Sequence, residues 1–175
     1  PRGEDIILSH KLEALTRALV ARLLGEGWTV RHDGEPEMRT LIKDVRATEE
    51  RGEVETYLVG SASGDETEHG LTYFDDDFAR RRAMAWQADA AIFVGGSTDV
   101  GQDGRTAMEH AFLDFAQQSE EAFLLVCTGY GGSTASKAFQ QLIRHENAEE
   151  VAENGPDAAT VVKGIVGEMH AAFNE

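Results

Sequence analysis

The chain has 175 residues, of which 41% are hydrophobic, and this length suits one domain with a sizeable core better than two. Its 32 acidic and 16 basic side chains give a formal net charge of −16, so the surface repels nucleic-acid phosphates and anionic lipid headgroups. A single cysteine, Cys127, excludes an internal disulfide and fits a reducing compartment. No apolar run in the sequence approaches the roughly 18 residues of a membrane-spanning helix. We therefore expect a cytoplasmic protein that binds neither nucleic acid nor membrane.

Strands and helices alternate along the predicted secondary structure. We expect a first strand over residues 5–9 and then a helix to residue 24, in which apolar side chains recur at helical spacing. The further predicted strands cover residues 28–30, 54–59, 88–94 and 123–128, and the further predicted helices cover residues 38–50, 78–87, 106–118, 133–145 and the stretch from Asp157 onward. Residues 61–70 have the composition of an exposed acidic loop.

Most of the predicted strands are nearly continuous apolar runs, which is typical of a parallel sheet covered by helices on both faces. We therefore predict an α/β fold with a three-layer, Rossmann-like, doubly wound and mainly parallel sheet. A single domain is expected over residues 1–175. Because the chain opens at Pro1 without an initiating methionine, we expect it to be excised from a longer protein.

Two glycine-rich turns follow predicted strands and open predicted helices. Without a Cβ atom, glycine lets backbone N–H groups approach an anion closely, and the following helix N-terminus offers further free N–H groups. The carboxyl ends of neighbouring parallel strands meet at one edge of a sheet, so we expect both turns to line one cleft. Turns with positive φ also require glycine when no ligand is present, and Ser133 and Thr134 also suit a helix N-cap. The candidate ligand-binding residues in these turns are Gly95, Gly96 and Ser97, and then Gly129, Gly131, Gly132 and Ser133.

Arg80 belongs to a basic triplet on the predicted helix 78–87, and its planar guanidinium suits a phosphate. The alternative is an ion pair with the acidic residues 75–77 on the helix surface. Thr106, in the first turn of the predicted helix 106–118, is a candidate ligand-binding residue because its hydroxyl is expected to face the ligand. Glu109 lies near the same helix start, where the helix dipole favours a carboxylate. It is therefore a candidate for hydrogen bonding to ribose hydroxyls, or for a purely structural role.

Ser9 and His10 follow the first predicted strand, so the topology places them at the same carboxyl edge as the glycine turns. The histidines show no metal-ligand spacing, and Glu109-His110 lacks the second histidine of a metalloprotease helix. We therefore predict neither a metal site nor a cofactor.

The segment 78–116 resembles a family signature. It contains Arg80, Met84, Ala88-Asp89-Ala90, Gly95-Gly96, Gly104-Arg105-Thr106 and Glu109, and in this it is similar to the Lonely Guy and SLOG superfamily. The resemblance extends more loosely to residues 6–10, 34–36 and 128–135. It implies a Rossmann-like fold and, by analogy with the Lonely Guy enzymes, roles for Arg80 and Glu109 in hydrolysing the N-glycosidic bond of a nucleoside monophosphate.

The chain departs from that enzyme pattern because residues 97–103 lengthen the glycine turn and Arg105 stands between Gly104 and Thr106. The longer loop is similar to that of the SLOG domains of Thoeris-type antiphage defence proteins. That similarity implies a homo-oligomeric sensor that binds a cyclic ADP-ribose isomer and regulates a fused or associated effector domain. The alternatives are a phosphoribohydrolase, a nucleoside deoxyribosyltransferase-like enzyme, and an assembly module that binds no nucleotide.

Overall fold

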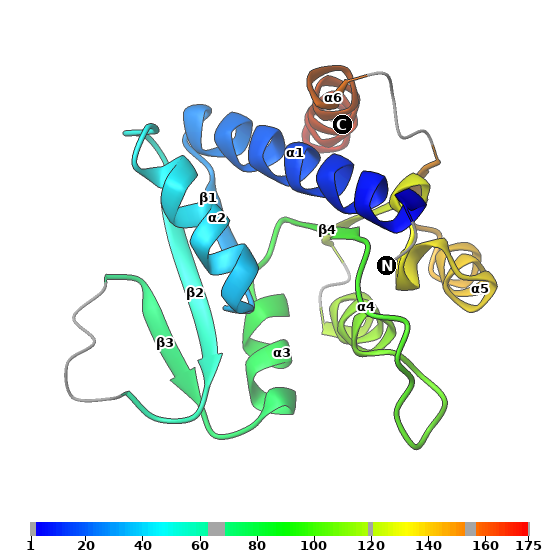
Figure 1. Ribbon diagram of the computed structural model, residues 1–175. Coiled ribbons are helices and arrows are strands. Elements are labelled where there is room, and N and C mark those ends of the chain that lie inside the picture. Colours follow the sequence, from blue (N-terminus) through cyan, green and yellow to red (C-terminus); the bar gives the residue numbers. More distant parts are fainter. Residues whose placement is uncertain (1–2, 63–68, 119–120, 153–156, 175) are drawn as a thin grey trace. The chain divides into compact units, whose positions relative to one another are not determined.

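The computed structural model describes residues 3–62, 69–118, 121–152 and 157–174, with only the backbone described over residues 3–9. The chain forms two compact units. We call Pro1–Thr16 together with Gln87–Glu175 the terminal unit, and Arg17–Trp86 the middle unit. Each unit contains a three-stranded parallel sheet flanked by helices (Figure 1). The predicted fold class is therefore confirmed: the protein is α/β and Rossmann-like, whereas its organisation as a single domain stays a prediction.

The middle unit has the strand order β1-β2-β3. Val30 lies opposite Val54 in this sheet and packs with it against a buried apolar cluster from two helices, so these helices cover one sheet face. The cluster consists of Val20, Leu24, Leu41, Ile42 and Val45. The elements of the unit are the second part of α1 (Gly3–Gly25), β1 (Thr29–His32), α2 (Pro36–Arg46), β2 (Glu53–Val59), β3 (Leu71–Phe74) and α3 (Asp77–Ala85).

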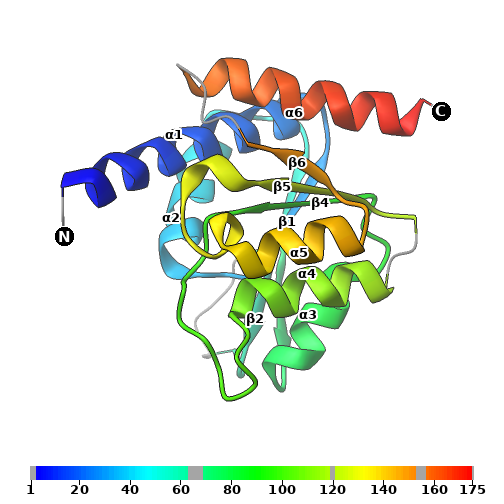
Figure 2. The ribbon, with the colours of Figure 1, turned by 90° about the vertical axis from the view of Figure 1, so that its right-hand side faces the viewer.

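The terminal unit has the strand order β4-β5-β6 and is built in three layers. Helix α6 and the first part of α1 lie on one face of its sheet, and α4 and α5 lie on the other (Figures 1 and 2). On the α4 side, the Phe93 ring of β4 lies 5.3 Å from Phe112 and 5.7 Å from Phe115 between ring centroids. The elements are β4 (Ala90–Val94), α4 (Ala107–Gln118), β5 (Phe123–Cys127), the 3₁₀ turns η1 (Thr128–Tyr130) and η2 (Ser133–Ala135), α5 (Lys137–His145), β6 (Glu149–Val151) and α6 (Ala158–Phe173).

The strand predicted over residues 5–9 is wrong, because α1 begins at Gly3 and continues to Gly25. Residues 4–24 contain neither glycine nor proline, so nothing in the sequence stops a helix once it has nucleated. A short apolar run is compatible with either a strand or a helix, and here it joins the helical spacing that follows it. Ser9 and His10 therefore lie within a helix and not at the end of a strand.

The other predicted strands and helices are present with ends that differ by a few residues. The strands β3 and β6 were missed, and the predicted helix 133–145 divides into η2 and α5 at Ser136, whose side chain caps α5. Residues 63–68 of the predicted acidic loop lie outside the described residues. Among the described helices, none has the length and apolar character needed to cross a bilayer.

Candidate functional site

The first glycine turn follows β4 in the terminal unit. Gly95 and Gly96 have φ values of 69° and 85°, a left-handed region that favours glycine. A Cβ atom on Gly95 would lie 2.9 Å from Leu12 Cδ2, and one on Gly96 would lie 2.9 Å from Met108 Cε. Backbone conformation therefore favours glycine at this turn, whereas the close atoms are the ends of flexible side chains that could shift.

The second glycine turn follows β5 and lies against the first. The N–H of Ser133 donates to the carbonyl oxygen of Gly96 at 3.0 Å, and the N–H of Thr134 donates to that of Gly95 at 3.1 Å. Gly132 has a φ of 68°, and a Cβ atom there would lie 2.5 Å from the Gly96 carbonyl oxygen. The structure thus brings the two turns together, backbone against backbone, at the carboxyl ends of two parallel strands.

Thr106 and Glu109 form a reciprocal cap at the start of α4. The N–H of Thr106 donates to Glu109 Oε2 at 2.6 Å, and the N–H of Glu109 donates to Thr106 Oγ1 at 3.2 Å. Thr106 Oγ1 also lies 2.5 Å from Ser133 Oγ, which ties the helix start to the second turn. Glu109 is only 5% exposed, so one of its carboxylate oxygens already serves the fold.

The loop between Gly96 and Thr106 is exposed and held by its own hydrogen bonds. Val100 forms an antiparallel bridge with Thr106, and the N–H of Gly101 donates to the Arg105 carbonyl at 2.8 Å. Asp103 accepts a hydrogen bond from the Arg105 N–H and lies 2.9 Å from His110 Nε2. The Arg105 hydrogen bond is the main reason that the pKa of Asp103 lies below its ordinary value, so this carboxylate is charged at neutral pH.

The turns leave backbone donors available to a ligand. Gly96 and Ser97 are exposed, and within the described part of the chain nothing accepts a hydrogen bond from either N–H group. Unpaired N–H groups at the end of a parallel strand and close to a helix N-terminus attract anions. This edge therefore offers backbone donors of the kind that an anion could use. Gly129 and Gly131 lie in the adjoining turn and are half-buried.

Arg80 lies on α3 in the middle unit. Its Nη1 donates to the carbonyl oxygen of Asp33 at 3.0 Å and its Nη2 pairs with Asp77, which also pairs with Arg81. The ion pairing considered as the alternative for this arginine is thus present. Among the described residues, Arg80 Nε is buried without a hydrogen-bond partner. Phosphate binding by Arg80 remains a prediction, as does a ligand role for Ser9 and for His10, which is exposed on α1.

Two further polar residues stand out in the structure: Thr134, which the sequence suggested only as a helix N-cap, and Arg31, which was not singled out from the sequence. Thr134 is fully buried, and its hydroxyl bonds to groups at the ends of both β4 and β5. Arg31 donates from Nε to Glu55 at 2.7 Å and from Nη1 to the carbonyl oxygens of Met84 and Trp86 at the end of α3. The only signal for Arg31 in the sequence is a charged side chain within the short stretch 29–32, and its position opposite Glu55 is visible only in the structure.

Cys127, the last residue of β5, carries a buried free thiol. Burial raises the pKa of Cys127 to about 12, so the thiol stays protonated at neutral pH. Burial also raises the pKa of the neighbouring Tyr130 hydroxyl. Within the described ranges, no cluster of three or more His, Cys, Asp or Glu side chains is arranged to hold a metal ion.

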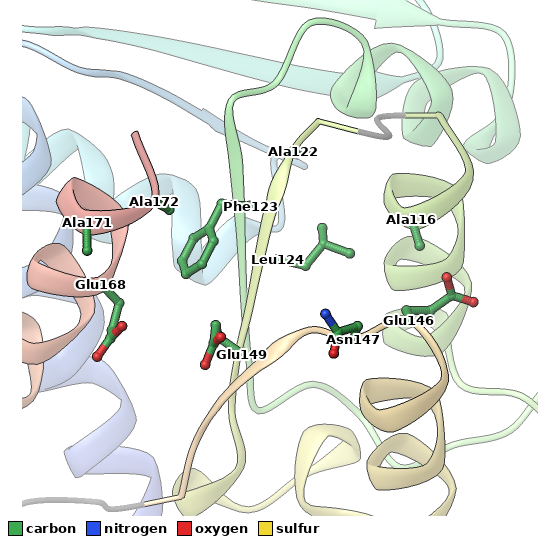
Figure 3. Close-up of a pocket in the computed structure, with 10 residues that line it drawn as sticks. All are labelled: Ala116, Ala122, Phe123, Leu124, Glu146, Asn147, Glu149, Glu168, Ala171 and Ala172. Atoms are coloured by element: carbon green, nitrogen blue, oxygen red, sulfur yellow. The ribbon is translucent and has the colours of Figure 1, made fainter. Parts of the chain in front are cut away.

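A cavity of about 540 Å³ lies elsewhere in the terminal unit (Figure 3). Phe123 and Glu149, the first residues of β5 and β6, line it, so it lies at the amino ends of the strands, opposite the glycine turns. Glu146 and Glu168 add two further carboxylates to its lining. This cavity repels anions and does not suit a phosphate.

Comparison of the chain with protein families, with curated proteins and with solved structures finds no match.

Proposed function

We propose that this protein is a sensor domain that binds an ADP-ribose-derived nucleotide of the cyclic ADP-ribose isomer class. The bound nucleotide regulates a fused or associated effector in bacterial antiphage defence, through a change in how the subunits of a homo-oligomer pack. The observation that carries the proposal is the contact between two glycine turns at the carboxyl edge of β4 and β5, with the N–H groups of Gly96 and Ser97 exposed. The messenger class and the effector come from the sequence resemblance.

The terminal unit offers a phosphate these N–H groups and the N-terminus of α4, whose dipole favours negative charge. Because the net charge of −16 repels anions from the surrounding surface, a phosphate depends on local hydrogen-bond donors such as these N–H groups. A phosphate contact by Arg80, which lies in the middle unit, is a separate prediction from the sequence. Hydrogen bonding of Glu109 to ribose has the weakest support, because its Oε2 already caps α4.

A phosphoribohydrolase is the weaker candidate because Glu109, its expected catalytic carboxylate, already caps α4. Its catalytic carboxylate must reach the ribose, whereas Glu109 is 5% exposed and hydrogen-bonded within its own helix. Incubation with AMP followed by chromatography separates the two functions. The sensor releases no free base, and release of adenine at a rate that Glu109→Gln abolishes would establish the hydrolase instead.

Calorimetric titration with cyclic ADP-ribose isomers, ADP-ribose and AMP tests the sensor directly. We expect heat of binding for at least one cyclic isomer, and an affinity that Arg80→Ala lowers by about tenfold or more through loss of a charged hydrogen bond. Arg82→Ala is the matched control, because Arg82 lies on the same helix and stacks on the Phe78 ring at 5.5 Å. Absence of heat with every nucleotide, from wild-type protein shown to be folded, contradicts the proposal.

A further inference from the structure

The hydroxyl of Thr134 lies where β4 and β5 separate. Val94 and Cys127 are the last paired residues of these two parallel strands. Beyond them, the N–H of Gly95 donates to Thr134 Oγ1 at 3.0 Å, and Thr134 Oγ1 donates to the carbonyl oxygen of Cys127 at 3.0 Å. A side-chain hydroxyl therefore bridges the two strand ends.

Thr134 bonds to both glycine turns and is completely buried. A hydroxyl has one proton to donate and two lone pairs to accept with, so one threonine satisfies both the Gly95 N–H and the Cys127 carbonyl. Its Oγ1 also lies 3.3 Å from the carbonyl oxygen of Gly131, and its backbone N–H donates to that of Gly95 at 3.1 Å. The position of Gly95 is thus set from both sides by one residue.

We propose that Thr134 is a positioning residue for the nucleotide site, holding the turn of Gly95 and Gly96 in the shape that presents the N–H groups of Gly96 and Ser97. This inference rests on the proposed function. Without the hydroxyl, the Gly95 N–H and the Cys127 carbonyl are either left unpaired in a buried place or drawn towards each other. Either change would alter the glycine turn that carries the exposed N–H groups of Gly96 and Ser97.

The test compares Thr134→Val with Thr134→Ser. Valine keeps the shape of the side chain and loses the hydroxyl, whereas serine keeps the hydroxyl. We expect Thr134→Val to weaken binding of the cyclic ADP-ribose isomer by about tenfold or more, as measured by calorimetry, and Thr134→Ser to restore it to near the wild-type value. If the valine variant does not fold, Thr134→Ala is measured in its place, and the same loss of affinity is expected because alanine also lacks the hydroxyl.

A matched control separates positioning from general loss of stability. Ser136→Ala removes the side-chain cap of α5, whose Oγ accepts from the Phe139 N–H at 3.1 Å, and it leaves both glycine turns untouched. We expect this variant to lose stability and keep its affinity. If it loses as much affinity as Thr134→Val, or if the valine variant binds as wild type does, the positioning role is overturned.

Amide hydrogen exchange at Gly95, without nucleotide, is a second readout. We expect faster exchange in Thr134→Val and wild-type exchange in Thr134→Ser, because Thr134 Oγ1 is the acceptor of this N–H. Unchanged exchange in the valine variant overturns the inference alone. A folded wild-type protein that binds no nucleotide overturns the proposed function, and the positioning role with it, whatever the exchange rates are.

Discussion

Two glycines of this protein differ in the contacts that a larger residue would make, and the local sequence does not reveal this difference. Gly132 and Gly104 look alike from the sequence, and both have positive φ, of 68° and 77°. A Cβ atom on Gly132 would meet backbone at 2.5 Å, whereas one on Gly104 would meet no atom within 4 Å. The first glycine is required by a contact as well as by its backbone conformation, and the second by conformation alone.

Substitution of each glycine by alanine measures this difference. We expect Gly104→Ala to lower the free energy of unfolding by about 1–2 kcal/mol, the cost of the left-handed conformation. Gly132→Ala should cost about 3 kcal/mol or more, because the displaced neighbour is backbone and cannot move aside. Denaturant titration checks both values. Equal losses would show that the two glycine turns do not lie as close together as described.

His32 is a buried titratable residue in the middle unit. The N–H of Gly34 donates to its Nδ1 at 3.2 Å, so Nε2 carries the proton and faces Thr56 Oγ1 at 2.7 Å. Burial lowers the pKa of His32 from its ordinary value of 6.5; Asp33 raises it and Arg39 lowers it further. Protonation would place a hydrogen on Nδ1 and remove the acceptor used by Gly34.

Stability should therefore fall as the pH falls. Between the lowered pKa of His32 and its ordinary value of 6.5, the unfolded chain binds more protons than the folded chain, so the free energy of unfolding rises with pH. The slope from this one group is at most about 1.4 kcal/mol per pH unit. We expect His32→Asn to flatten the profile below the ordinary histidine pKa of 6.5. His145→Asn is the control, since that side chain is 82% exposed, and an equal flattening there would contradict the assignment.

At the scale of elements, side chains cap the helix ends, and some of these side chains come from residues far away in the sequence. The Nη1 atom of Arg31 donates to carbonyl oxygens at the end of α3, and its Nε donates to Glu55 Oε2. Its guanidinium also lies 5.0 Å from the centroid of the Tyr57 ring. Val30 and Val54 face α2, and neighbouring strand residues point to opposite faces of the sheet. The side chains of Arg31, Glu55 and Tyr57 therefore lie on the other face, where Arg31 contacts α3.

Replacement of Arg31 by alanine should lower the free energy of unfolding by about 2 kcal/mol, because several charge-assisted hydrogen bonds are lost together. Lysine should recover little, since an ammonium group cannot reproduce the spread of a guanidinium. Arg17→Ala is the control in the same unit: Arg17 pairs with Asp44 at 3.3 Å on an exposed surface, and the pair is worth about 0–1 kcal/mol. Thermal or denaturant unfolding measures all three variants, and similar losses for Arg17 and Arg31 would contradict this role.

Variants of Glu109 can distinguish the contribution of its charge to the start of α4 from that of its hydrogen bond. A glutamine at position 109 still accepts a hydrogen bond from the Thr106 N–H, as in the Gln form of the capping box, whereas an alanine leaves that N–H without its partner. We expect Glu109→Ala to cost about 1–2 kcal/mol of unfolding free energy and Glu109→Gln to cost much less. Denaturant titration of both variants tests this. Equal losses would show that the carboxylate charge, rather than the hydrogen bond, stabilises the helix start.

At the scale of the whole molecule, the dominant physical property is the net charge of −16. Repulsion among the excess carboxylates opposes the folded state, and dissolved salt screens this repulsion. The ion pairs lost to the same screening are mostly exposed and therefore weak. The balance favours the folded protein as salt concentration rises.

We expect the melting temperature to increase by a few degrees when NaCl is raised from about 10 mM to about 150 mM, a range over which the screening length falls from roughly 30 Å to 8 Å. KCl should act equally, because the effect requires no specific ion site. Calorimetry at constant pH checks this. A melting temperature that falls with salt would mean that ion pairs, rather than excess negative charge, dominate the electrostatics.

Local chemistry explains what was predictable from the sequence. Apolar runs predicted β1, β4 and β5, alternating apolar positions predicted β2, and helical spacing helped to predict the helices between them. Glycine pairs after strands predicted the two turns of the candidate site. Each of these signals lies within a few neighbouring residues, so the sequence by itself determined the α/β class and the chemistry of the turns.

Only the tertiary structure decided which distant groups meet. The Gly95 N–H finds its acceptor 39 residues away in Thr134, and Arg31 reaches the end of α3 at Met84, 53 residues away. The apolar run near the N-terminus is helical, and the strands divide into two three-stranded sheets. The short strands β3 and β6 become strands through pairing with β2 and β5. Hydrogen bonds of this kind depend on long-range packing, for which a linear pattern of residues holds no signal.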